Sequence, residues 1–146
     1  MIARALRSES GTSLIEFALL APALIMLLVG LIEVGRFAYF GILAAHAAEA
    51  GAHYGAQNLE TAVQTTSIQN AALADAQNLS QWRVTATTTC TESGVTVSCT
   101  ASASSATIVY FVQVHVTGAF TSLLKYPGIP NQIPVSSTAT ARVLSQ

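Results

Sequence analysis

The positions of the apolar residues divide the chain into an N-terminal segment of continuous hydrophobicity and a longer part in which apolar and polar residues alternate. Residues 17–32 carry no charge, and as a helix they would be about 24 Å long, slightly less than the roughly 30 Å hydrocarbon core of a bilayer. Leu14 and Ile15 on one side, and residues past Glu33 on the other, complete the span. The pattern predicts a membrane-spanning helix near the N-terminus.

An alanine-rich stretch continues this helix as far as residue 57. Alanine has the highest helix propensity and gives a smooth surface, so we expect this face to pack closely on sister helices. Asn58 is the predicted end of the helix, and an irregular apolar stripe over 59–79 predicts a second helix. The alanines of the first helix are Ala44, Ala45, Ala47, Ala48, Ala50 and Ala52.

The next segment predicts a β-hairpin. Residues 82–90 alternate between two faces, as a half-buried strand does. Ser93 and Gly94 supply a turn, and residues 95–101 form the returning strand. The predicted inward side chains of the two strands are Val84, Ala86, Thr88, Cys90, Val95, Val97, Cys99 and Ala101.

Two further strands complete the predicted sheet. Residues 107–117 are apolar on both faces for several positions, which is typical of a central strand covered by a helix. Three prolines predict an irregular loop over 123–134, and residues 136–143 form the last strand. Its inward side chains are predicted to be Ser137, Ala139, Ala141 and Val143. The fold class is therefore α+β, with a long N-terminal helix, a second helix and an antiparallel sheet of about four strands.

Cys90 and Cys99 are the two cysteines of the chain, and both have the inward parity of their strands. That parity makes a disulfide across the hairpin geometrically reasonable, with the two cysteines opposed. Disulfides are typical of exported domains. Two cysteines alone lack the ligands for a metal site.

The charge pattern indicates how the chain would sit in a membrane. Only 9% of the residues are charged, compared with about 25% in soluble domains, and a net charge of −1 argues against nucleic-acid binding. Arg4 and Arg7 outweigh Glu9, which places the N-terminus in the cytoplasm. At the far interface Glu33 and Arg36 are three residues apart and can pair. Three aromatic residues follow as an interfacial belt: Phe37, Tyr39 and Phe40.

A cleaved secretory signal peptide is the alternative interpretation, with a small-residue site in residues 44–50. The apolar run is longer than the usual 7–15 residues, and the site lies far beyond it. A charged pair also separates the two. A membrane helix that is retained fits the pattern better.

The string Gly11-Thr12-Ser13-Leu14-Ile15-Glu16-Phe17 resembles a prepilin processing site. Such a site has a short basic leader that ends in glycine, then an apolar helix with glutamate at its fifth residue. The resemblance implies cleavage between Gly11 and Thr12 by a membrane prepilin peptidase on the cytoplasmic side. Glycine suits that position because it lets a protease approach the backbone.

Residues 11–57 are similar to a narrower family, the TadE-like pseudopilins of tight-adherence (Tad/Flp) type IV pilus systems. The matching motifs are Glu16-Phe17-Ala18, Pro22, Glu33-Val34-Gly35-Arg36 and Gly51-Ala52-His53-Tyr54. The resemblance implies a leader (1–11), a transmembrane and extended helix (12–57) and a pilin-like exported domain (58–146).

This resemblance also implies a function and a location. The function is that of a minor pilin in pilus assembly or initiation, in a pilus involved in surface adherence. The implied partners are the major pilin, other pseudopilins, the prepilin peptidase and the inner-membrane assembly platform. The protein would be a single-pass inner-membrane protein with a periplasmic C-terminal domain, and later part of the pilus at the cell surface.

Glu16 and Pro22 have predicted roles in assembly, beside Phe17. After cleavage the Glu16 carboxylate lies four residues from the new Thr12 amine, on the same side of the helix. It can neutralise the amine of a neighbouring subunit, because a paired buried charge costs less than a lone one. A glutamate that simply faces the headgroups is the alternative. Pro22 removes a backbone donor and marks a point where the helix can kink.

Catalytic and ligand-binding chemistry has little support. His46 and His53 lie about 10.5 Å apart along a helix, too far to bind one metal ion with Glu49 between them. His115 is expected on the outer side of the sheet. We find no nucleophile motif or phosphate loop, so we expect no enzyme, no cofactor, no metal and no small-molecule substrate. The rival hypotheses are a secreted binding domain with an ordinary signal peptide and a permanently anchored single-pass binding domain.

Overall fold

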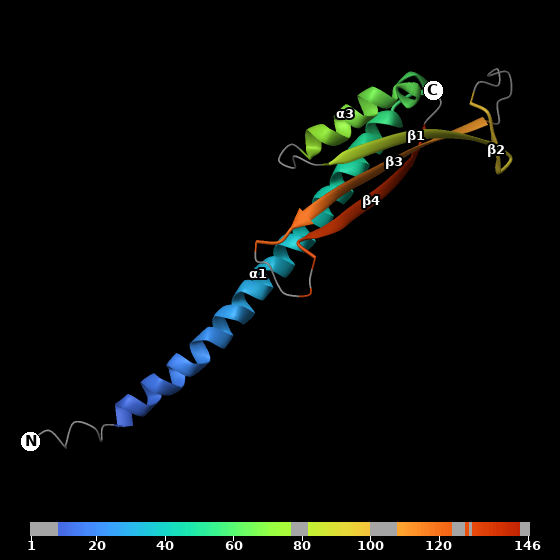
Figure 1. Cartoon of the computed structure of the whole chain (residues 1–146). Helices are drawn as coiled ribbons and strands as arrows, with labels where there is room; N and C mark the ends of the chain where they lie inside the picture. Colours follow the sequence, from blue (N-terminus) through green and yellow to red (C-terminus); the bar gives the residue numbers. More distant parts are fainter. Residues whose placement is uncertain (1–8, 77–81, 100–107, 124–127, 129, 144–146) are drawn as a thin grey trace, which may run out of the picture. The chain divides into compact units, whose positions relative to one another are not determined.

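The computed structural model describes residues 9–76, 82–99, 108–123, 128 and 130–143. The elements are α1 (Glu9–Gly55), α2 (Leu59–Val63), α3 (Thr65–Asp75), β1 (Arg83–Glu92), β2 (Val95–Val97), β3 (Ile108–Thr121) and β4 (Gln132–Arg142) (Figure 1). The chain divides into two compact units, residues 1–37 and 38–146. The predicted α+β fold, with its long N-terminal helix and four-stranded antiparallel sheet, is confirmed.

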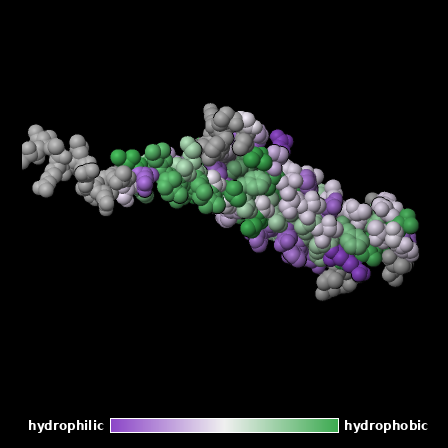
Figure 2. Space-filling view, turned by 90° about the horizontal axis from the view of Figure 1, so that it is seen from below, coloured by the Kyte–Doolittle hydropathy of each residue, from purple (hydrophilic) through white to green (hydrophobic). Residues whose placement is uncertain are grey.

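In the N-terminal unit, α1 exposes large apolar side chains on every side. Leu19 is 77% exposed and Met26 is 76% exposed. Figure 2 shows these apolar residues gathered along the N-terminal part of the helix. The segment Ser13–Gly55 is long and apolar enough to cross a membrane. A surface that is apolar all round is typical of a helix that lies in lipid or among other apolar helices.

In the second unit, α1 buries a stripe of small residues against its own domain. The stripe recurs at spacings of three and four residues, so its members lie on one helix face. They are Ala44, Ala47, Ala48, Gly51, Ala52 and Gly55. The expectation that the alanine face packs on sister helices is therefore wrong for these alanines, because the chain's own sheet and α3 already cover them.

The two glycines of this stripe mark where α1 lies closest to its neighbours. A Cβ on Gly51 would lie 3.0 Å from Ala72 Cβ and 3.2 Å from Val114 Cγ1. A Cβ on Gly55 would lie 2.8 Å from Val112 Cγ1. All three distances are shorter than ordinary carbon contacts. The backbone of α1 therefore rests directly on β3 and α3.

The predicted second helix over 59–79 is two helices, and residues 77–79 of that prediction lie outside the described residues. Asn58, the predicted break, is the N-cap of α2: its side chain accepts from the Thr61 N–H in a capping box. Gln64, with φ −87° and ψ 69°, separates α2 from α3. In one continuous helix Ala62 and Ile68 would face about 120° apart. The break lets both side chains reach the core, where each is fully buried.

The sheet has the order β2-β1-β3-β4, with all neighbours antiparallel. Ser93 and Gly94 have positive φ angles of 50° and 82°, which is the signature of a tight hairpin turn. β3 is the central strand, as predicted: Val112, Val114 and Val116 are fully buried. The inward parities predicted for β1 and β4 agree with the alternating burial of those strands.

Pro134 lies inside β4, although we predicted that it ends an irregular loop. The hydrogen bond from the Val143 N–H to the Tyr110 carbonyl (2.9 Å) shows that odd-numbered residues of β4 bond to β3. The even-numbered Pro134 therefore has its nitrogen on the free edge of the sheet. A proline there removes no ladder hydrogen bond, and edge strands tolerate it.

Two apolar clusters hold the second unit together. The larger joins α1, α2 and α3 to the three buried valines of β3. The smaller contains Ala44, Phe120 and Val135, with Phe40 packed against it. The Phe40 and Phe120 rings meet edge to face, with centroids 5.2 Å apart. Trp82 packs on both clusters, and Gly118 leaves room for its ring: a Cβ there would lie 2.7 Å from Trp82 Cδ2.

Candidate functional site

Gly11 and Thr12 lie in the first turns of α1. The bond between them is the one at which the resemblance implies cleavage. Glu16 follows one turn later and is exposed. The helical backbone from Thr12 to Glu16 places both residues on one side of the helix.

Glu16 is isolated from other charges along the helix. It is the only charged residue between positions 13 and 32. The next charged residue of α1 is Glu33, about 25 Å further along the axis. A counter-charge for the Glu16 carboxylate must therefore come from the N-terminal end of the chain or from another molecule. A carboxylate in apolar surroundings is costly without such a partner.

Phe17 and Pro22 lie on the same exposed apolar helix. Phe17 is 64% exposed. The helix continues through Pro22 without interruption. Pro22 has no N–H to donate to the carbonyl of Ala18, so this turn has one hydrogen bond fewer than its neighbours.

Glu33 and Arg36 form an ion pair at the end of the uncharged run. Arg36 Nη1 lies 3.3 Å from both carboxylate oxygens of Glu33. The two residues are one turn apart, which is the spacing at which helical side chains meet. The pair neutralises the Glu33 carboxylate next to the apolar segment.

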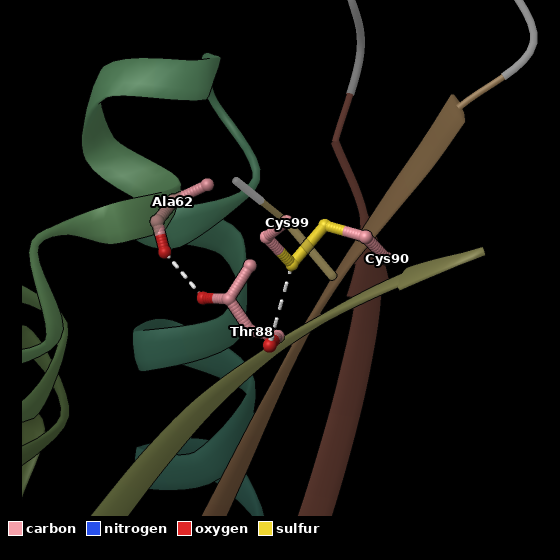
Figure 3. Close-up of a disulfide and its surroundings, with 4 residues drawn as sticks. All are labelled: Ala62, Thr88, Cys90 and Cys99. Carbon is pink, nitrogen blue, oxygen red and sulfur yellow. Dashed lines mark hydrogen bonds between the residues drawn. A yellow bond between two sulfur atoms is a disulfide. The ribbon is translucent and has the colours of Figure 1, made fainter. Parts of the chain in front are cut away.

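Cys90 and Cys99 form a disulfide, with Cα atoms 5.3 Å apart (Figure 3). The prediction that the two cysteines are opposed is wrong in detail. The two-residue turn pairs Cys90 with Val97, and β2 ends there. Cys99 lies two residues further on, beside β1, with its Sγ 3.8 Å from the Thr88 carbonyl oxygen. The disulfide therefore keeps the segment that follows β2 next to β1.

Thr88 connects this hairpin to the helices. Its hydroxyl donates a hydrogen bond to the carbonyl of Ala62 in α2 (Figure 3). Cys90 is fully buried next to it. The disulfide links β1 to the segment that follows β2, and the hydrogen bond links β1 to α2. The three segments are therefore held together in one part of the domain.

The histidines are distributed over separate surfaces. His46, Glu49 and His53 are exposed on α1. Within the described ranges, no three His, Cys, Asp or Glu side chains converge on a point where a metal ion could bind. His115 is exposed on the outer side of the sheet, as predicted, with Nδ1 2.8 Å from Thr138 Oγ1.

The close packing at Gly51 and Gly55 was not predicted from the sequence. Gly51 and Gly55 fall at helical spacing among the buried alanines. That spacing was visible in the sequence, but it does not reveal whether the partner is a sister helix or the chain's own sheet.

Residues 11–53 match the family model described as TadE-like protein. This match confirms the resemblance over the segment that contains Glu16, Pro22 and the Glu33–Arg36 pair. No curated protein and no solved structure matches the chain significantly. The chain is thus an α+β protein with a long apolar N-terminal helix. Its similarity to the TadE-like family indicates a protein associated with the Tad pilus system.

Proposed function

We propose that this chain is a minor pilin, or pseudopilin, that takes part in the assembly or initiation of a Tad/Flp-type pilus. One observation carries the proposal: in the segment that matches the TadE-like family, the part of α1 before residue 38 has apolar side chains that are exposed all round. Such a helix needs lipid before assembly and other apolar helices after it. The role is structural, without catalysis.

The processing step follows from the N-terminal residues. A prepilin peptidase cleaves between Gly11 and Thr12, and the helix stays in the inner membrane with the remaining domain in the periplasm. Cleavage creates an amine at Thr12, and Glu16 supplies the carboxylate that neutralises the amine of a neighbouring subunit. The isolation of Glu16 from other charges of its own helix supports this role.

The partners in this proposal are the major pilin, sister pseudopilins, the prepilin peptidase and the inner-membrane assembly platform. The domain beyond residue 38 would remain folded throughout, because its helices and sheet share one core. In the assembled pilus this domain would lie at the surface that meets the environment.

Intact-mass measurement and N-terminal sequencing of the protein from its native host test the proposal. We expect a chain that begins at Thr12 and retains the apolar helix. A chain that begins near Ala48 would identify a secreted domain released by signal peptidase. An uncut chain that begins at Met1 would identify a permanent membrane anchor. Either of the last two results would end the pilin interpretation.

A further inference from the structure

The outer face of the sheet, opposite the helices, is rich in hydroxyl groups. The register aligns three strands across it: Thr85, His115 and Thr138 form one row, and Thr87, Gln113 and Thr140 form the next. The side chains of these two rows are exposed. Hydroxyl groups both donate and accept hydrogen bonds, so this face can bind ligand groups that are hydrogen-bond donors or acceptors.

Charge on this face is of one sign. Arg83 is the first residue of β1 and Arg142 is the last residue of β4, and both are exposed. Among the described residues, the acidic side chains of the chain lie elsewhere: Glu92 has the inward parity of β1, and the others lie on helices. A chain with a net charge of −1 therefore presents a sheet face with arginines and no described carboxylate.

The two arginines are far apart on the face. Arg83 pairs with Thr117, and Arg142 pairs with Phe111. Six residues along β3 separate these rows, which corresponds to roughly 20 Å, and the two arginines are two strands apart, which adds about 10 Å in the other direction. The rows of hydroxyl groups lie between them. An extended ligand is needed to reach both arginines.

We propose that this face, which we call the threonine face (the outward side chains of β1, β3 and β4 between Arg83 and Arg142), binds an acidic polysaccharide. The hydroxyl, amide and imidazole groups suit neutral sugar hydroxyls. The arginine guanidinium groups suit sparse carboxylates, with which they form charge-assisted bonds. Phe111, half-buried beside Arg142 in the row that follows the last hydroxyl row, supplies apolar contact area for a sugar ring.

Nucleic acid fits the threonine face less well. A DNA duplex presents on the order of thirteen charges over roughly 22 Å, whereas the face has two arginines over that diagonal. Proteins that bind single strands use several stacking aromatics, and Phe111 is the one phenyl, tyrosyl or indole ring among the described outward residues of the three strands. Wide spacing of charge favours a polymer in which carboxylates alternate with neutral sugars.

This inference does not depend on the pilin proposal, because the face belongs to the folded domain of a single chain. The test uses the full chain in phosphatidylcholine nanodiscs and measures binding to immobilised hyaluronan, with neutral dextran and duplex DNA as comparisons. We expect binding to hyaluronan that weakens as the salt concentration rises from 50 to 200 mM, because salt screens charges that are farther apart than the Debye length, which is about 10 Å at 0.1 M. We expect little binding to dextran, which carries no charge.

Substitutions then locate the binding surface. Arg83→Gln and Arg142→Gln should each weaken hyaluronan binding by up to about fivefold, the upper end of the range expected for an exposed charged pair. Thr87→Val should weaken it by a smaller factor without a change in salt dependence. Asn70→Asp changes the net charge by the same amount on α3, which packs against the opposite face of the sheet, and is the matched control. Trp82 fluorescence confirms that each variant is folded.

Four results would overturn the proposal. Tighter binding to DNA than to hyaluronan would make the face a nucleic-acid surface. Equal losses in Asn70→Asp and the two arginine variants would show that only net charge matters. Unchanged affinity in both arginine variants, or no binding to hyaluronan at all, would show that the threonine face is not the binding site.

Discussion

The two parts of α1 use apolar residues in opposite ways. Before residue 38 the helix is rich in leucine, isoleucine and phenylalanine, and these large side chains are exposed. After residue 38 the same helix turns alanine and glycine toward its own sheet and buries them. The contrast teaches that hydrophobicity alone does not predict burial in this chain. Large side chains extend toward a medium outside the protein, whereas small ones let two backbones approach each other.

The two parts also differ in where their charges find partners. Glu33 has Arg36 within its own helix at 3.3 Å, whereas Glu16 has no other charged residue between positions 13 and 32. The first charge is balanced within the helix, and in our proposal the second pairs with the amine of a neighbouring subunit. Each of the variants below alters either the N-terminal part of α1 or the folded domain, and leaves the other part unchanged.

The largest effect is expected from Glu16→Ala. Replacing this carboxylate should leave membrane insertion intact, or ease it, because an apolar helix gains from losing a charge. Incorporation into pili should fall by more than about tenfold, because the Thr12 amine loses its partner. Immunoblots of sheared pili and of membrane fractions measure the two outcomes separately. Glu60→Ala, an exposed charge on α2, is the control, and normal pilus yield from Glu16→Ala would disprove the pairing.

The next effect concerns the small-residue stripe. Gly51→Val should destabilise the second unit by about 3 kcal/mol, because a Cβ there already lies 3.2 Å from the Ile68 carbonyl oxygen and from Val114 Cγ1. Gly41→Val is the matched control, since nothing lies within 4 Å of its Cβ. Urea unfolding in detergent, followed by Trp82 fluorescence, measures both. Equal stability of the two variants would contradict the close packing.

Removal of the disulfide should have a slightly smaller effect. The Cys90→Ser, Cys99→Ser double variant should lose about 2–3 kcal/mol of stability, the value of the chain-entropy model for a loop of about ten residues. The same urea unfolding curves measure the loss, and thiol labelling of the unreduced wild-type protein checks that the bond is present. Two free thiols in the native and the denatured protein would show that the bond does not form in the cell.

The smallest effect is expected at the start of α2. Asn58→Ala removes the side chain that accepts from the Thr61 N–H at 2.8 Å, and loss of an N-cap costs about 1 kcal/mol. Asn58→Asp retains an acceptor and should lose much less. If Asn58→Ala were as stable as Asn58→Asp, the capping box would not contribute to the stability of the folded domain.

Much of the fold was predictable because it depends on local patterns. The long helix, the break at Asn58, the turn at Ser93 and Gly94 and the inward parity of β1 and β4 all follow from spacing and residue type. The split of the second helix at Gln64 was not predictable, because its cause is the need for Ala62 and Ile68 to face the same core. The position of Pro134 within β4 depends on which edge of the strand is free, which the sequence does not state.

The sequence by itself determined that this chain has an apolar N-terminal helix with a carboxylate five residues after a glycine, because these features are contiguous along the chain. Only the tertiary structure decided that the alanine stripe packs on β3 and α3, that Cys90 pairs in register with Val97 while bonding to Cys99, and that hydroxyl rows from three strands form one face. The physical reason is that a helix face or a strand face specifies what can be buried, whereas the partner that buries it comes from residues far away in the chain.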